Sequence, residues 1–208
     1  MYIKSFFKVL TCAVALQVGA GAAMAEDKSP WQVRLRLIDV VPDESSTVSI
    51  GGNVTADNSL VPELDITYFW NDHFATELIL ATSKHNIGAT GTALGDLDLG
   101  HAWVLPPTLL AQYHFNPHGT IRPYVGAGLN YTFFYSEDAG ALDTIEYEDG
   151  FGFALQAGLD IGLDDHWMLN ADVKKIYLNT DVSINGGAVT ADVDLNPWVF
   201  GLGIGYRF

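Results

Sequence analysis

The chain has 208 residues, of which 49% are hydrophobic and 17% charged, and 10 basic against 25 acidic residues give a formal net charge of −15 at pH 7. So acidic a chain repels phosphate backbones, which excludes nucleic acid as an expected partner. The only cysteine, Cys12, lies in a segment predicted to be removed. Its loss excludes disulfides, thiol catalysis and cysteine-ligated metals.

Residues 1–25 have the features of a secretory signal peptide. Lys4 and Lys8 form a basic start, residues 9–23 are mostly apolar, and Ala23-Met24-Ala25 is a small-x-small cleavage site. We therefore expect a signal peptide at 1–25 and one β-barrel domain at 26–208. No later apolar run is long enough for a membrane helix, which excludes a helical membrane protein.

Strict alternation of large apolar side chains with small or polar ones predicts strands, because a strand repeats every two residues. In the sixth segment, Phe151, Phe153 and Leu155 face one way, and Gly152 and Ala154 face the other. The pattern predicts eight strands, at residues 31–41, 60–70, 74–85, 105–115, 122–135, 151–163, 167–178 and 198–208.

The last of these segments carries aromatic residues at both ends of its apolar face. Trp198 and Phe200 stand at one end, and Tyr206 and Phe208 at the other. Aromatic girdles around an outward apolar band are typical of strands that cross an outer membrane. We assign Tyr206 and Phe208 to recognition by the barrel-assembly machinery during biogenesis.

The connections between the eight segments alternate in length. They are short at 71–73, 116–121 and 164–166, and long at 42–59, 86–104, 136–150 and 179–196. Successive antiparallel strands place alternate connections at opposite ends. We therefore predict an all-β fold, an eight-stranded antiparallel transmembrane β-barrel with short periplasmic turns and long extracellular loops. The expected location is the outer membrane of a Gram-negative bacterium.

Eight charged residues share the strand face opposite the large apolar side chains. We assign them to a polar plug inside the barrel: Arg34, Glu63, Asp65, Glu77, Asp160, Asp172, Lys174 and Arg207. The alternative is a soluble, lipocalin-like barrel, which we disfavour because so many charges would be very costly to bury in a closed soluble core.

Nearer the long loops, the inward residues become apolar. Ile79, Ala81, Leu110 and Phe134 are predicted to line this upper lumen. Because eight strands enclose a space only just wide enough for side chains, two interpretations stay open. The lumen is either a channel that admits a hydrophobic molecule above a polar plug, or a solid peg whose charges only satisfy one another.

Several stretches of the chain resemble the OmpW/AlkL family of small outer-membrane proteins. They are residues 105–109 (LPPTL), 122–131 (RPYVGAGLNY), 170–173 (NADV), 197–200 (PWVF) and 205–208 (GYRF). The resemblance implies an eight-stranded barrel with a narrow hydrophobic channel for uptake of small hydrophobic molecules. Their passage is proposed to go sideways, through an opening in the barrel wall.

Pro106 and Pro107 suit such a lateral opening, because proline cannot donate to a strand ladder. Their alternative role is to end a loop and start a strand. The resemblance also implies an apolar constriction, and Ile79 keeps the apolar character of one of its positions. The other position, aromatic in a family member, is Lys174 here, and a lysine beside acidic residues favours an ion pair over an apolar gate.

Two other functions compete with uptake. One is a structural or adhesive barrel without transport. The other is a lipid A-modifying hydrolase that uses Ser83 and His85, which we disfavour because alternation turns both inward, away from lipid. We therefore predict that the protein is not an enzyme.

We expect no cofactor and no metal site, since the histidines lack ligand spacing and acidic loops are more often solvated. The expected partners are outer-membrane lipids and lipopolysaccharide, the barrel-assembly machinery and small hydrophobic solutes.

Overall fold

The structure, a computed structural model, describes residues 29–49, 51–93, 95–140 and 143–208. The predicted signal peptide at 1–25 lies outside the described residues. In the described part, no helix is long and apolar enough to span a membrane. The strands are β1 Trp31–Val41, β2 Ser45–Val48, β3 Asn53–Ala56, β4 Ser59–Phe69, β5 Phe74–Ala81, β6 Ser83–Thr92, β7 Gly95–Leu105, β8 Thr108–His114, β9 Ile121–Asp138, β10 Ile145–Tyr147, β11 Gly150–Gly162, β12 Trp167–Tyr177, β13 Asn179–Ile184, β14 Val189–Asp194 and β15 Trp198–Arg207.

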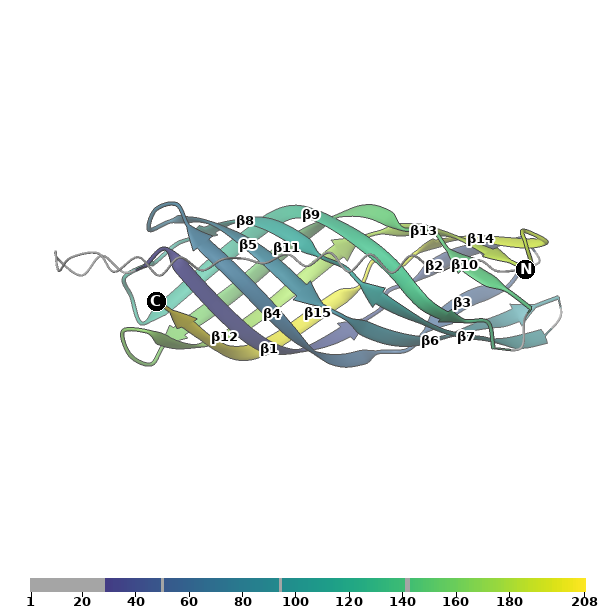
Figure 1. Ribbon diagram of the computed structural model, residues 1–208, viewed down its shortest axis with the longest axis horizontal. Helices are drawn as coiled ribbons and strands as arrows, with labels where there is room; N and C mark the ends of the chain where they lie inside the picture. The colour runs from purple at the N-terminus through teal and green to yellow at the C-terminus, as the bar shows by residue number, and fades with distance from the viewer. Residues whose placement is uncertain (1–28, 50, 94, 141–142) are drawn as a thin grey trace, which may run out of the picture.

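Eight of these strands close into an antiparallel barrel, in the order β1-β4-β5-β8-β9-β11-β12-β15 (Figure 1). The β1–β15 ladder joins the first strand to the last, with Arg34 opposite Gly205 and Leu37 opposite Leu202. Closure leaves these strands without free edges. The predicted fold class is confirmed. The predicted segment 74–85 splits into β5 and the start of β6, because the chain breaks its pairing at Thr82.

Short turns connect the barrel strands at the end of the molecule where the C-terminus lies (Figure 1). In the β4–β5 turn, the Asn71 side-chain oxygen accepts hydrogen bonds from the backbone N–H groups of His73 and Phe74, both at 2.9 Å. In the β11–β12 turn, Asp164 accepts in the same way from His166 and Trp167, at 2.8 and 2.7 Å. Short polar side chains thus supply the turn hydrogen bonds that the ladders cannot.

The connections predicted as long extracellular loops contain strands that extend the barrel outward. On one side β3, β6 and β7 continue the barrel sheet, and on the other β10, β13, β14 and β2 form a four-stranded sheet. Between them lies a second apolar cluster: Ala89, Leu99, Ile145, Val182, Ile184, Ala191 and Val193. This extracellular extension, defined by these seven strands, therefore has its own core.

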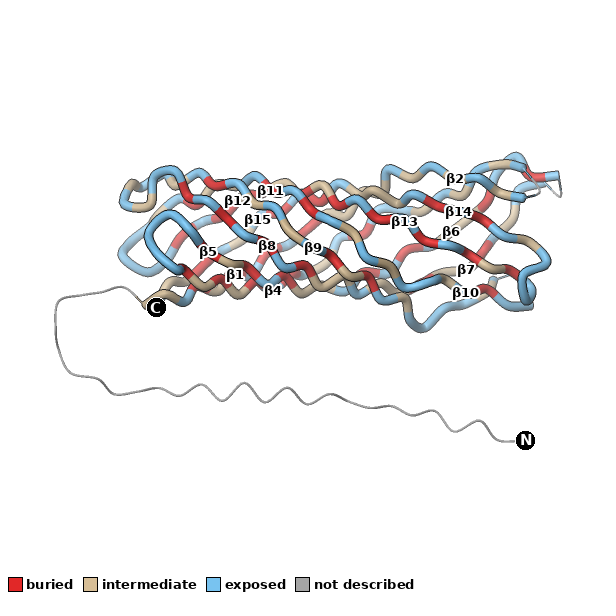
Figure 2. The backbone as a smooth tube through the Cα atoms, turned by 90° about the horizontal axis from the view of Figure 1, so that it is seen from above, coloured by how far each residue is buried: buried red, intermediate tan, exposed pale blue. Residues whose placement is uncertain are grey.

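The barrel strands turn large apolar side chains outward and charged ones inward. In Figure 2, buried and exposed residues accordingly alternate along the barrel strands. Phe151 is 78% exposed and Leu202 69% exposed, whereas Arg34, Asp65 and Glu77 are fully buried. This is the reverse of a soluble barrel and the arrangement expected when lipid surrounds the protein. The predicted orientation is therefore correct.

The inward face of β15 consists largely of glycine, and two of these positions are places of close approach. A side chain at Gly201 would collide with the Asp172 carboxylate, and one at Gly203 with the backbone of Leu35 and the side chain of Arg36. The closing strand therefore provides room for charged side chains that come from other strands.

Candidate functional site

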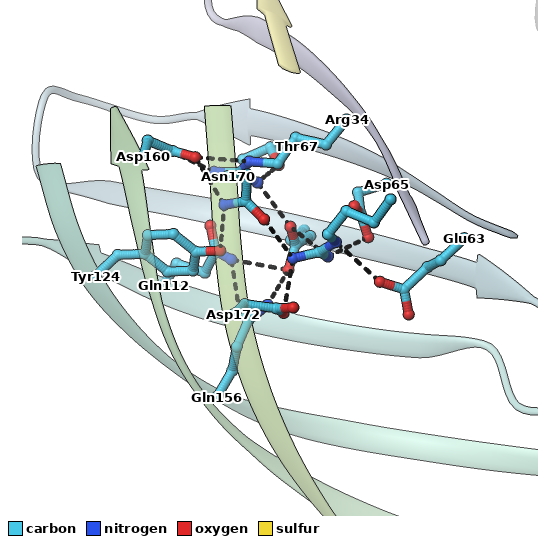
Figure 3. Close-up of polar contacts among 12 residues, drawn as sticks. Arg34, Glu63, Asp65, Thr67, Gln112, Tyr124, Gln156, Asp160, Asn170 and Asp172 are labelled. Atoms are coloured by element: carbon cyan, nitrogen blue, oxygen red, sulfur yellow. Dashed lines mark hydrogen bonds and ion pairs between the residues drawn. The ribbon is translucent and has the colours of Figure 1, made fainter. Parts of the chain in front are cut away.

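The lower half of the barrel lumen holds a network of buried ion pairs (Figure 3). Arg34 on β1 binds Asp160 on β11 through two parallel hydrogen bonds, Nε to Oδ1 at 3.2 Å and Nη2 to Oδ2 at 2.7 Å. Its Nη1 donates to Glu77 Oε1 at 2.7 Å and to Thr67 Oγ1 at 3.0 Å. This bidentate, fully buried guanidinium therefore connects four strands, the neighbours β1, β4 and β5 and, across the lumen, β11.

Arg36, two residues further along β1, is the centre of this network. Its Nη1 lies 2.6 Å from Asp172 Oδ2, its Nε 2.9 Å from Glu63 Oε1, and its Nη2 2.5 Å from Asp65 Oδ1. The register places Arg36 directly opposite Glu63 on β4. Arg36 was not among the residues predicted for the plug. It alternates in phase with Arg34, and this phase was the sequence signal that could have identified it.

Lys174 completes the upper edge of the network, with its Nζ 2.7 Å from Glu63 Oε1 and 3.0 Å from Asp172 Oδ2. Gln156 links two carboxylates, since its Nε2 donates to Asp172 at 2.9 Å and to Glu77 at 3.0 Å. The ionic network therefore consists of Arg34, Arg36, Lys174, Glu63, Asp65, Glu77, Asp160 and Asp172.

Burying these charges is costly, and the cost is offset only because each carboxylate and cation has close partners. Removing one member would leave its partners buried without a counter-charge. Seven of the eight residues predicted for the plug are thus brought together.

Arg207, the eighth, lies apart from the ionic network in the described structure. Its guanidinium carbon sits 3.9 Å from the centre of the Phe69 ring, near the turns. Tyr206 and Phe208, predicted to act in barrel assembly, pack there with Trp167 and His166.

An apolar cavity of about 100 Å³ lies directly above the ionic network, with Glu63 and Lys174 at its floor. Ile79, Ala81 and Phe134 line it, as do aliphatic residues of β1, β12 and β15. Leu110, also predicted for this lining, is buried in the adjoining apolar cluster with Ile79 rather than on the cavity wall. The cavity walls expose mainly carbon, so they suit an apolar solute.

The barrel wall beside this cavity contains an interruption of its ladder. The β5–β8 ladder ends at the pair Ile79 and Thr108, and the β6–β7 ladder starts at the pair Ser83 and Val104. Register is continuous across the interruption, so Ala81 stands at the position opposite Pro106. Among the described residues, no ladder pair joins residues 80–82 to residues 105–107. Beside this stretch, Thr82 Oγ1 donates to the Val104 carbonyl at 3.2 Å.

The two prolines remain attached to β9 on their other side. The Pro107 carbonyl accepts the Tyr131 N–H at 3.1 Å, and the Pro106 carbonyl accepts from Asn130 at 3.2 Å. Pro106 also lines the cavity. The interruption therefore separates residues 80–82 from residues 105–107 at the height of the apolar cavity, and proline explains why the ladder is not completed.

Ser83 and His85 share the inward face and contact each other, with His85 Nε2 2.9 Å from Ser83 Oγ. The Nδ1 of His85 bonds the backbone carbonyl of Asp57 at 2.7 Å, so it is held by a neutral peptide oxygen rather than by a carboxylate. The Asp57 carboxylate instead accepts from Asn86. The pair lacks the carboxylate that orients histidine in a catalytic triad, and it faces the cavity instead of the lipid.

In the part of the chain that the structure describes, no group of three or more His, Cys, Asp or Glu residues is placed to hold a metal ion.

A family model described as the OmpW family matches residues 28–208. The chain belongs to the OmpW family. It is 43% identical over 196 residues to the uncharacterized outer-membrane protein y4mB of Sinorhizobium fredii, which covers 91% of this chain and 84% of that protein. It is 35% identical over 210 residues to outer membrane protein W of Vibrio cholerae, covering 94% of this chain and 96% of that one.

The fold agrees with the family. The structure matches the crystal structure of OprG from Pseudomonas aeruginosa with a TM-score of 0.82 and 31% identity, over 87% of this chain and 97% of OprG. This OmpW-family chain is therefore an outer-membrane barrel of a Gram-negative bacterium. Family and fold are those of outer-membrane barrels rather than of a known enzyme class.

A further relative has a name that refers to metabolism. The dibenzothiophene metabolism operon protein DoxH of Pseudomonas sp. is 31% identical over 194 residues, which cover 88% of this chain and 90% of DoxH.

Proposed function

We propose that this barrel takes small hydrophobic molecules into its apolar cavity from outside and releases them sideways into the membrane at Pro106 and Pro107. The observation that carries the proposal is the position of the ladder interruption, beside the cavity and above the ionic network. A molecule in the cavity therefore has a weak wall next to it and a charged floor below.

The ionic network opposes straight passage to the periplasm. An apolar solute moving down would separate Arg36 and Lys174 from their carboxylates, and each uncompensated buried charge costs several kcal/mol. Sideways exit costs less free energy, because the ladder hydrogen bonds between residues 80–82 and residues 105–107 are already missing. The energetic difference favours the lateral route.

The relatives support an apolar cargo. The name of DoxH connects that protein with an operon for dibenzothiophene, an aromatic sulfur heterocycle with little polarity. A cargo of that chemical class suits the carbon-lined cavity here.

Filling the cavity tests entry. Ile79→Trp places a bulky ring on the cavity wall and should slow the uptake of a hydrophobic probe such as naphthalene into proteoliposomes. Heat-modifiable gel mobility should show that the variant barrel still assembles. Leu202→Trp, on the lipid-facing side, is the matched control and should leave uptake unchanged. Unchanged uptake in Ile79→Trp would contradict a luminal route and favour a structural or adhesive barrel.

A cross-link tests the exit. Because Cys12 is the only cysteine, the double variant Ala81→Cys with Pro106→Cys allows oxidation to join the two sides of the interruption. We expect naphthalene uptake to fall on oxidation and to recover on reduction, while each single variant is insensitive. Full uptake by the cross-linked barrel would contradict lateral exit but leave entry into the lumen standing.

A further inference from the structure

A second apolar cavity, of about 20 Å³, lies in the extracellular extension above the first. Four side chains line both cavities and so form the partition between them: Val54, Ile87, Tyr147 and Val182. Of these four, only Tyr147 carries a polar group. Any molecule that passes from the upper cavity to the lower one must displace this partition.

The Tyr147 hydroxyl is buried and has no hydrogen-bond partner among the described residues. Buried polar groups are almost always hydrogen-bonded, and an unpaired one costs free energy. Burial and the nearby Glu137 carboxylate raise the pKa of Tyr147, so the hydroxyl keeps its proton and is available as a donor. The closed partition thus contains one unused donor beside the apolar side chains of Val54, Ile87 and Val182.

The other polar side chains at this height have partners. The Asp57 carbonyl can only accept, so His85 Nδ1 carries a proton and donates to it, and His85 Nε2 lies 2.9 Å from the Ser83 hydroxyl oxygen. Ser83 and His85 thus have hydrogen-bond partners, whereas the Tyr147 hydroxyl has none among the described residues.

The strand that carries Tyr147 is short and lies at a sheet edge. β10 has three residues and stands at the end of its four-stranded sheet, where Tyr147 pairs with Val182 of β13. The Tyr147 ring stacks on Phe134 of the barrel, with centroids 5.4 Å apart and planes at 22°. Few bonds therefore have to change for the ring to move, because short edge elements open at low free energy.

We infer that Tyr147 is a gate that selects hydrophobic molecules carrying one hydrogen-bond acceptor, such as ketones or esters. When the ring moves aside, the carbonyl oxygen of such a molecule accepts the Tyr147 O–H, which gains a bond that the closed state lacks. A hydrocarbon offers no acceptor and gains nothing from the hydroxyl. The inference deepens the proposed function and rests on it for the passage of solutes along the lumen.

A spectroscopic measurement tests the bond without requiring transport. The full-length mature barrel in nanodiscs is given 2-nonanone labelled with ¹³C at the carbonyl, and the infrared carbonyl band is compared with that of empty nanodiscs. We expect a shifted, hydrogen-bonded band in the wild type that is absent from Tyr147→Phe and from Tyr147→Ala. Tyr131→Phe, which removes a hydroxyl on the lipid-facing side, is the matched control and should keep the band.

An uptake measurement tests selection. In proteoliposomes, Tyr147→Phe should lower the rate for 2-nonanone by roughly three- to tenfold, the value of one hydrogen bond, and leave the rate for nonane unchanged. Tyr147→Ala should raise the nonane rate, because the partition becomes open.

An identical carbonyl band in the wild type and in Tyr147→Phe would overturn the inference, whatever the uptake. An unchanged ketone-to-alkane ratio in an actively transporting Tyr147→Phe would overturn it too. If the wild type shows the band but admits neither solute, the proposed uptake function fails and the Tyr147 binding site stands.

Discussion

The inward side chains of this barrel fill the lumen below Glu63 and Lys174 but not above them. Below them, long charged and amide side chains meet across the lumen and fill it. Above them, shorter aliphatic side chains such as Ile38 and Val199 reach less far and leave a cavity. β1, β4, β5 and β12 contribute side chains to both halves, and strands of the extracellular extension such as β6 and β7 join the wall of the cavity. On the shared strands, the side chains decide whether the interior is closed or hollow.

The difference also concerns how each half is held together. In the ionic network, every bond depends on a particular partner at a particular angle, so a change at one residue affects several strands. In the apolar half, contacts are non-directional, and neighbours adjust to a small change in volume. The two halves should therefore respond very differently to substitution.

The largest effect is expected at Arg36. Arg36→Met keeps much of the volume but leaves Glu63, Asp65 and Asp172 without their shared cation, and breaking a buried ion pair costs about 3–5 kcal/mol. The free energy of unfolding should fall by that amount, measured by urea denaturation in lipid vesicles with tryptophan fluorescence. Lys84→Met, at an exposed lysine of β6, is the control. A loss below about 1 kcal/mol would show that the network contributes specificity rather than stability.

A smaller effect is expected in the apolar half. Ile38 is 2% exposed and lines the cavity. Ile38→Val removes one methylene, and such changes cost about 0.5–1.5 kcal/mol. The same urea titration measures it, with Leu37→Val on the lipid-facing side as the control. A loss as large as that of Arg36→Met would mean that the two halves are equally rigid.

The smallest effect lies outside the lumen, where a carboxylate faces water. The backbone N–H groups of Trp167 and His166 hold the pKa of Asp164 below its ordinary value. Since the folded pKa is depressed, this stabilisation is complete at neutral pH and is lost as the pH falls through the folded pKa. Carbon NMR of the carboxyl group should titrate below the ordinary aspartate range, and Asp164→Asn should weaken the acid dependence. An ordinary pKa would show that the turn bonds are not formed in solution.

Much of the barrel could be predicted because each strand encodes its own orientation. The alternation around Phe151 and Leu202 depends only on the strand period and on the lipid outside. The turns at Asn71 and Asp164 could be predicted for the same reason, because their hydrogen bonds join residues that are close in the sequence. Such features need no knowledge of what lies across the lumen.

The centre of the ionic network could not be derived in the same way. Arg36 becomes the hub only because register places it opposite Glu63 and because Gly201 and Gly203 leave space beside it. Those relations join strands that are far apart in the sequence.

The extracellular extension was missed because its strands are short and contain many polar residues. Asn185-Gly186, between β13 and β14, is a recognised hairpin signal that would have revealed part of it.

The glycines of β15 and the arginines of β1 meet only where the first and last barrel strands pair. Before that ladder forms, Arg34 cannot reach Asp160 and Arg36 cannot reach Asp172, which belong to β11 and β12 on the far side of the seam. A half-open sheet in lipid would keep Arg36 beside Glu63 on β4 but would separate Arg34 from Asp160 and Arg36 from Asp172, and such intermediates should be sparsely populated. Formation of the β1–β15 ladder also completes the ion pairs that cross it, so we expect barrel closure to be cooperative.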